Sequence, residues 1–577
     1  MNRTATIAGA LLLSLAAGAT APAQSDVFEA VPGDALGVIV IHQLGDTAAR
    51  IEKMGHKMQL PVPALLPAIQ AQVGIQEGID PKGSVAILIM PRKEGTRTAR
   101  PIVMVPVSDY TQVAEQLKVA DSSGAIAEVQ VGGQPMLIAK KGNYAVLASP
   151  EDKEILQHVL DTRENITPVV EPLRAWFAKN QVTAVATPRG IKQSLEGAQN
   201  LVKQFPLLLP EKEIAKFEGG MKLVSDFLTS TRGEVTHFAV GLRIDDESAI
   251  HVGSRTLFAP DGKFARSVGS IKAPEDLLAG LPAVPFAFVM AGVYPEDWGQ
   301  ALAKLKVQSM KINPVTSRMT PEQMKKLAEA TASFMRGTRS IAMVFGTTGP
   351  DEPLYSNAVA LMRVDDAQQT LARYEQSMRD INEIFKDDKD KLIHYEIRRI
   401  QIGDLKAIEV DMDMTKMMPD PGAIRMMEAM FGPGGKSKFY FAALDAKTVG
   451  LAYVRPDLLE QAAEALHGKR PGLEKDGNIA KTRELLPEGA QLAGYVSPAG
   501  LINFGKAFMA ALSLTKAAQL PEFPQTPPIG MAAKLSASGV ETDVVVPAPV
   551  LETLGGYVRK LSEPRPNQAR EEVKRAE

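Results

Sequence analysis

The sequence has 577 residues, 45% hydrophobic and 23% charged, with a formal net charge of −2. This composition is typical of globular proteins and excludes a disordered or fibrous chain. The near-neutral charge argues against nucleic acid as a partner, because proteins that bind nucleic acid usually carry an excess of Lys and Arg. The chain contains no cysteine, which excludes disulfides, thiolate catalysis and iron–sulfur clusters.

The first 23 residues have the three regions of a secretory signal. Arg3 precedes an apolar run from Ile7 to Ala17, and small residues follow up to Ala23. This pattern predicts cleavage between Ala23 and Gln24 and an extracytoplasmic location, either periplasmic or secreted. We expect no membrane span, because the apolar run is shorter than the roughly 20 residues that a spanning helix needs. We expect no lipid anchor of the bacterial lipoprotein type either, because that anchor requires a cysteine.

A series of short apolar segments, several of them followed by a helical stretch, occurs twice in the same order. The first pairs are Leu36–Ile41 with Phe286–Val293, Gly83–Ile89 with Arg339–Phe345, and Ile102–Asp109 with Ala358–Asp365. The next are Tyr144–Ala148 with Val449–Tyr453, and Val182–Ala186 with Leu492–Val496. The last repeated unit is a hairpin. Its first copy consists of His237–Ile244 and Ala249–Leu257, and its second copy consists of Ala532–Ser538 and Glu541–Val546. Repetition in a fixed order predicts an internal duplication.

The mixture of hairpins and strand-to-helix steps predicts an α+β fold. We expect two tandem related halves, each a largely antiparallel sheet with helices packed on one face. The first half would span 24–270 and the second 271–561, with an insertion near 380–435 in the second. Helices are expected after the strands, among them Tyr110–Leu117, Trp298–Leu305 and Ala367–Met378. Residues 562–577 read as a disordered charged tail.

Catalytic motifs are weak, and no cofactor is expected. The seven histidines are scattered. His237 and His251 flank a predicted hairpin and could meet across it, but half-buried sheet histidines are the favoured interpretation. One Ser-x-x-Lys occurs at Ser513–Lys516 without its companion motifs. The loop Gly432–Ser437 ends like a phosphate-binding loop, but Met430 stands where the first glycine of that motif belongs.

Two acidic clusters are candidate ligand sites. Asp411 and Asp413 would share one face of a strand, and Asp387–Asp390 is a charged run. Neither fits the twelve-residue calcium loop with its central glycine and closing glutamate. We expect both to be solvated surface.

Methionine is concentrated in the segment 412–430 of the predicted insertion, at Met412, Met414, Met417, Met418, Met426, Met427 and Met430. Thioethers are soft ligands, so Met412, Met414, Met417 and Met418 are candidates for Cu(I). Alternatively, Met426, Met427 and Met430 could form the apolar face of a helix that packs on the sheet. A third interpretation is a pliable lid or partner surface, since methionine adapts its shape.

The opening Val31–Ala35, Val-Pro-Gly-Asp-Ala, precedes a hydrophobic strand, and Leu486–Ala490 repeats its Leu/Val-Pro-x-x-Ala pattern; Leu281–Pro285 departs at the last position. In this pattern the chain resembles large exported bacterial proteins that have no assigned activity. The resemblance implies export and a turn before a strand, and it gives no residue a functional role.

These features together predict an exported, non-enzymatic binding or envelope-associated module. Its partner would be a protein or small-molecule ligand that the sequence does not identify. Two alternatives stay open. One is a hydrolase whose site is assembled from distant residues, and the other is a copper or hydrophobic-ligand handler that uses the segment 412–430.

Overall fold

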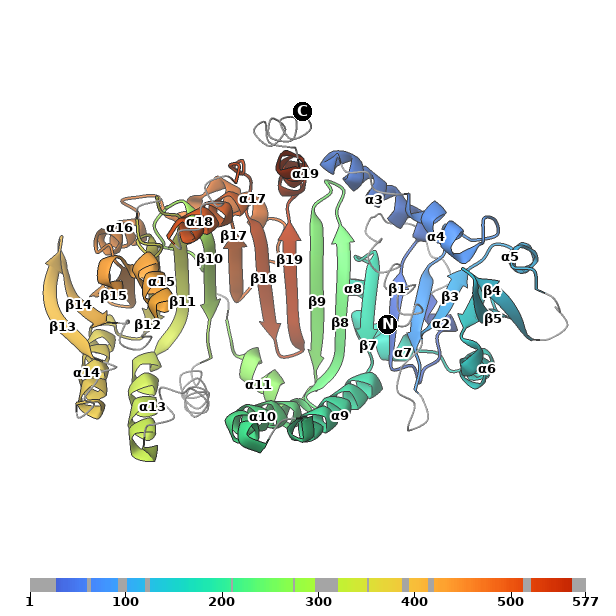
Figure 1. The fold of residues 1–577 in the computed structure, drawn as a ribbon, viewed down its shortest axis with the longest axis horizontal. Helices are drawn as coiled ribbons and strands as arrows, with labels where there is room; N and C mark the ends of the chain where they lie inside the picture. The colour runs from blue at the N-terminus through green and yellow to red at the C-terminus, as the bar shows by residue number, and fades with distance from the viewer. Residues whose placement is uncertain are drawn as a thin grey trace, which may run out of the picture. The chain divides into compact units, whose positions relative to one another are not determined.

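The computed structural model describes residues 27–59, 64–91, 101–119, 125–208, 211–272, 276–295, 320–349, 352–386, 394–413, 420–511 and 520–562. Several predicted features lie outside these residues: the secretory signal, the helix Trp298–Leu305, the acidic run Asp387–Asp390, the motif Ser513–Lys516 and nearly all of the tail. The chain forms two compact units (Figure 1). Unit 1 comprises Met1–Asn200, Ser230–Ala265 and Ser538–Glu552, and unit 2 comprises Leu201–Thr229, Arg266–Ala537 and Thr553–Glu577.

Unit 1 is built on an antiparallel sheet with the strand order β19-β9-β8-β7-β1-β2-β3-β6-β5-β4. The strands are β1 Gly37–Ile41, β2 Val85–Ile89, β3 Ile102–Pro106, β4 Ile126–Val131, β5 Gln134–Lys141, β6 Tyr144–Ala148, β7 Val182–Ala186, β8 Val235–Ile244, β9 Ile250–Phe258 and β19 Gly539–Val546. The helices are α2 Val27–Ala30, α3 Leu44–Met58, α4 Leu65–Val73, α5 Tyr110–Gln116, α6 Lys153–Asp161, α7 Thr167–Val170, α8 Arg174–Phe177 and α9 Pro188–Gln204, which continues into unit 2. β19 comes from the C-terminal part of the chain and pairs with β9 along its whole length.

The α+β class with a largely antiparallel sheet is confirmed, but helices cover both faces of this sheet where one face was expected. On β6, Val146 packs in one core cluster with Leu156 of α6, while Leu147 packs in another with Ile51 of α3 and Val113 of α5. Successive side chains of a strand point to opposite faces, so the two clusters lie on opposite sides of the sheet. Strands that are apolar throughout, such as β2 and β6, are typical of a sheet buried on both faces.

Unit 2 has the antiparallel strand order β18-β17-β10-β11-β12-β16-β15-β14-β13. The strands are β10 Phe286–Val293, β11 Thr338–Gly346, β12 Ala358–Val364, β13 Tyr395–Ile402, β14 Leu405–Asp413, β15 Lys436–Ala443, β16 Thr448–Tyr453, β17 Leu492–Val496 and β18 Ile529–Ser536. The helices are α10 Glu211–Thr231, α11 Lys263–Gly269, α13 Pro321–Met335, α14 Ala367–Ile384, α15 Pro421–Phe431, α16 Asp457–Leu466, α17 Gly477–Arg483, α18 Pro498–Ala511 and α19 Ala548–Ser562; α11 and α19 begin in unit 1. Helix α14 packs through Leu371 and Met378 on Phe441 of β15.

The same connections occur in the two sheets. In unit 1, β1 lies between β2 and β7, and β3 pairs with β6. In unit 2, β10 lies between β11 and β17, and β12 pairs with β16. Unit 2 has one more strand beyond the position of β4, which is β13, and this strand lies in the segment 380–435 where the sequence predicts an insertion.

Candidate functional site

The register of unit 2 places three rows of uncharged side chains on one face of β12, β11, β10, β17 and β18, which lie side by side (Figure 1). The rows are Ala358, Phe345, Phe288, Val496 and Ile529; then Ala360, Met343, Met290, Gly494 and Met531; then Met362, Ile341, Gly292, Leu492 and Ala533. We call this surface the methionine face. Its residue types are those of a protein core.

The centre of the methionine face is accessible to solvent. Met290 is 51% exposed and Met531 39%. On the same strand as Met290, the alternate residues Ala287, Val289 and Ala291 are buried. The strand β10 therefore buries one set of side chains and leaves an equally apolar set partly open. Single exposed apolar residues are normal on protein surfaces, whereas several in one row of a sheet form an apolar patch, a feature typical of binding surfaces.

A chain of aromatic rings links the methionine face to the helix of the methionine-rich segment. Phe288 stacks on Phe345 with ring centroids 4.4 Å apart. Phe345 contacts Tyr355 at 5.4 Å, and Tyr355 contacts Phe431 of α15 at 5.1 Å. Aromatic pairs at these separations add packing energy beyond their buried area. One side of the methionine face is thereby lined by aromatic rings in contact, one pair stacked and two pairs edge to face.

The structure places the methionines of the segment 412–430 differently from one another. Met412 lies on β14 and is buried, with Ser437 opposite it on β15. Met426, Met427 and Met430 lie on α15, where Met427 is buried. The other three candidates for a copper site, Met414, Met417 and Met418, lie outside the described residues.

Unit 1 has a comparable face over β2, β1, β7 and β8. One row runs through Ile89, Gly37, Ala186 and Phe238, and the next through Ile87, Ile39, Ala184 and Val240. Ile89, Phe238 and Val240 are exposed. The rows continue onto β9 as Thr256 and Ser254, so this face ends in hydroxyl groups where the methionine face stays apolar.

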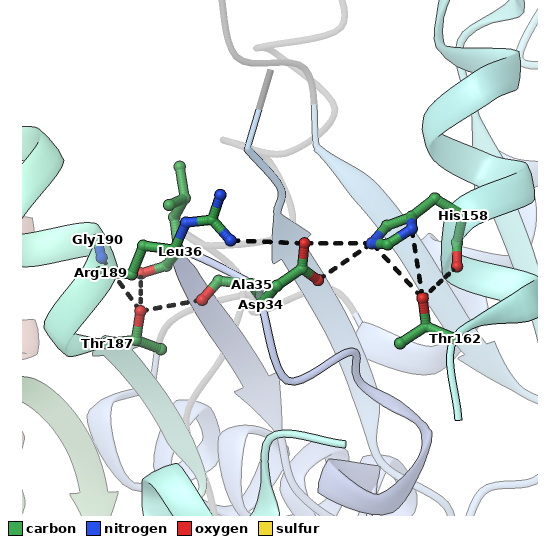
Figure 2. A network of polar contacts seen from close by, with 8 residues as sticks. All are labelled: Asp34, Ala35, Leu36, His158, Thr162, Thr187, Arg189 and Gly190. Atoms are coloured by element: carbon green, nitrogen blue, oxygen red, sulfur yellow. Dashed lines mark hydrogen bonds and ion pairs between the residues drawn. The ribbon is translucent and has the colours of Figure 1, made fainter. Parts of the chain in front are cut away.

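A polar network surrounds Asp34 in the Val31–Ala35 opening (Figure 2). Both carboxylate oxygens of Asp34 lie 3.2 Å from Nε2 of His158, and Nη1 of Arg189 lies 3.7 Å from one of them. The hydroxyl of Thr162, next to the imidazole, donates to the backbone carbonyl of His158 at 2.7 Å. The Thr162 hydroxyl therefore caps the end of α6, and the charged groups are exposed. We interpret the network as surface ion pairs that link the opening turn to α6.

A second polar cluster lies between β8, β9 and β19. His251 is 3% exposed; its Nδ1 lies 3.2 Å from Asp543 and its Nε2 3.3 Å from Asp245, while Arg243 lies 2.8 Å from Nδ1. Burial lowers the pKa of His251, but its hydrogen bonds to the two carboxylates outweigh burial, and the pKa lies above its ordinary value. The cluster fastens the C-terminal strand to the sheet of unit 1.

The two hairpin histidines do not meet. His237 lies opposite Leu257 and its Nε2 is 2.7 Å from the carbonyl of Val169, whereas His251 lies opposite Arg243. The carboxylates on His251 lie at its two ring nitrogens and so do not converge on one point. Across the described residues, no three His, Asp or Glu side chains are gathered so that they could hold a metal ion.

The remaining sequence candidates have local structural roles. Residues 433–435 form a turn of 3-10 helix between α15 and β15, and Ser437 is buried. Asp411 on β14 pairs with Arg398 at 3.3 Å, and Arg398 also binds Glu409 at 3.0 Å. These contacts place Asp411 in an ion-pair network on the sheet, where its side chain is 15% exposed.

Comparison with known proteins does not add a relative: no family model matches the chain, and neither a curated protein nor a solved structure matches it. In the part of the chain that the structure describes, each helix is too short or too polar to cross a membrane.

Proposed function

We propose that the protein is an exported, non-enzymatic binding module that holds an apolar ligand on the methionine face of unit 2. The observation that carries this proposal is the three rows of uncharged side chains, with Met290 half exposed at their centre. A surface without charge favours a neutral, apolar occupant, because a charged ligand would lose hydration there without gaining a partner.

The side chains of this face suit a ligand of variable shape. Methionine is unbranched and adapts to irregular surfaces, and Met290 and Met531 are both solvent-accessible. Covering the exposed half of Met290 is worth on the order of 1 kcal/mol, since full burial of such a side chain contributes about 1.5–3 kcal/mol.

Titration with the neutral hydrophobic dye Nile red tests this proposal. The full chain should enhance the dye's fluorescence, and Met290→Glu should weaken dye binding at least fivefold, because it places a charge at the centre of the face. Leu501 on α18 has the same exposed fraction, 51%, so Leu501→Glu is the matched control and should leave dye binding unchanged. Absence of dye binding by the unaltered chain, or equal losses in the two variants, would contradict the proposal.

Export and the lack of enzymatic activity have tests of their own. We expect the extracytoplasmic protein to begin at Gln24, which mass spectrometry of its N-terminus would reveal; a chain that keeps Met1 in the cytoplasm would overturn export. We also expect no covalent labelling by a fluorophosphonate probe. Labelling that disappears in Ser513→Ala would establish the alternative, a serine hydrolase.

We also propose that units 1 and 2 arose by internal duplication. The shared strand connections support this, and so does one matched detail. The N–H of Thr187 donates to the carbonyl of Leu36, and the N–H of Ser497 donates to that of Ala287, both at 3.0 Å. In each unit the hydroxyl of this residue then accepts the N–H of the glycine three residues later at 3.1 Å.

A further inference from the structure

The centre of the methionine face brings three thioether side chains from three different strands into one row. Met290 of β10 lies directly opposite Met343 of β11. On its other side Met290 lies opposite Gly494 of β17, which in turn lies opposite Met531 of β18. Side chains that face each other on neighbouring antiparallel strands are about 5 Å apart at Cβ. Met290 and Met343 are therefore direct neighbours, and Met531 is two strands away from Met290.

Gly494 removes the obstacle between Met531 and Met290. A Cβ atom built on Gly494 would lie 2.7 Å from Cγ and 3.0 Å from Sδ of Met531. The thioether of Met531 therefore extends over β17, in the space that a side chain at position 494 would fill. Since adjacent strands are about 4.8 Å apart, this lean brings the sulfur across roughly half of the distance to β10.

From this arrangement we infer that Met290, Met343 and Met531 form a site for a soft monovalent cation, Cu(I) or Ag(I). This inference uses the same face as the proposed function but does not depend on an apolar ligand binding there. It differs from the sequence-based copper candidates, whose only described member, Met412, is buried in another part of the sheet.

The chemistry of the row favours soft cations over hard ones. A thioether is an uncharged, polarisable ligand, and such ligands select Cu(I) over Mg²⁺, Ca²⁺ or Zn²⁺, which take carboxylate, carbonyl or imidazole ligands. The three rows contain no carboxylate and no imidazole. The chain has no cysteine, so methionine is its only sulfur ligand. Exposure of Met290 and Met531 gives the ion an entry path from solvent.

Replacement by leucine separates metal binding from apolar packing. Leucine is similar to methionine in volume and hydrophobicity and usually substitutes for it at low cost, but it has no sulfur. The test variant carries Met290→Leu, Met343→Leu and Met531→Leu together. The control variant carries Met378→Leu, Met412→Leu and Met427→Leu, three positions that are buried in the same unit.

The experiment is an Ag(I) titration of the full chain with methyl-labelled methionine, together with anaerobic Cu(I) competition against a chromophoric chelator. We expect the ε-methyl signals of Met290, Met343 and Met531 to shift together, and the test variant to lose affinity at least tenfold while the control keeps it. Gly494→Ala retains every sulfur but displaces Met531, so it should weaken the affinity as well. Equal affinities in the unaltered chain and the test variant would overturn the site.

Nile red binding of the same variants keeps this inference distinct from the proposed function. The leucine test variant should still bind the dye, because its face stays apolar. Loss of the metal without loss of dye supports the thioether site. A chain that binds the dye but no metal refutes the site alone, and a chain that binds metal at the three methionines but no dye refutes the apolar-ligand proposal alone.

Discussion

The start of helix α9 lies against strand β1 so closely that only glycine fits at position 190. A Cβ on Gly190 would lie 1.9 Å from the carbonyl oxygen of Leu36. We therefore expect Gly190→Ala to push the helix away from the strand by about 1 Å. That movement would also weaken the hydrogen bonds that the Thr187 hydroxyl makes with Leu36 and Gly190, at 3.0 and 3.1 Å.

The size of the effect follows from three contributions. Overpacking a close contact costs about 1–3 kcal/mol, and each weakened hydrogen bond costs about 1 kcal/mol. Alanine returns about 1 kcal/mol because it is the better helix former. We expect Gly190→Ala to lower the free energy of unfolding of unit 1 by about 2–4 kcal/mol.

Urea unfolding followed by tryptophan fluorescence measures this change, since Trp176 lies in the core of unit 1. Gly197 on the same helix is the control, because a Cβ there would meet nothing within 4 Å. Gly197→Ala should stabilise the chain slightly, by up to about 1 kcal/mol. If Gly190→Ala is as stable as the unaltered chain, or if the two variants lose equal stability, the close-approach argument is refuted.

Unit 2 offers the same pair of substitutions. A Cβ on Gly500 of α18 would lie 1.8 Å from the carbonyl oxygen of Phe286, whereas a Cβ on Gly505 of the same helix would meet nothing within 4 Å. We expect Gly500→Ala to destabilise and Gly505→Ala to be neutral or stabilising.

The remaining predictions concern charged groups in unit 1. Burial lowers the pKa of His42 to about 4, so the free energy of unfolding should fall as the pH drops from 6.5 through 4. The loss should be smaller than about 3 kcal/mol, because the residue is partly exposed. His42→Gln should flatten this pH dependence of the urea midpoint. The raised pKa of His251 contributes stability below pH 6.5 that is lost as the pH rises through that pKa, and an NMR titration should show a lower pKa for His251 in Asp543→Asn. Asp34→Asn should change the free energy of unfolding by less than about 1 kcal/mol, because its ion pairs are exposed. A larger loss would show that the network stabilises the fold more than exposed ion pairs do.

Hydrophobic patterning and turn residues are enough to locate most of the strands. The segment Phe286–Val293 was predicted as a strand with the bounds that the structure has for β10, and Tyr144–Ala148 matches β6 in the same way. Short apolar runs bounded by Pro, Gly and Asp are local signals, and they need no knowledge of distant contacts. The prediction of antiparallel pairing followed from the short turns between neighbouring runs.

The candidate site could not be predicted in the same way. The alternate residues of β10 are equally apolar, and only the packing of other elements buries Val289 and leaves Met290 open. The row of Met290, Met343 and Met531 needs the register of four strands, whose positions in the chain differ by up to about 240 residues. Of the methionines that stand out in the sequence, at 412–430, those that the structure describes are divided between strand β14 and helix α15.

The sequence by itself determined the class of fold, the places of most strands and the absence of disulfides, because these depend on local patterning and composition. Tertiary structure alone decided that helices cover both faces of unit 1, that β19 pairs with β9, and that the centre of the methionine face remains open. The physical reason is that burial and strand register depend on which distant segments pack together. The alternation of side chains along a strand assigns each residue to one face of the sheet, but it does not determine what covers that face.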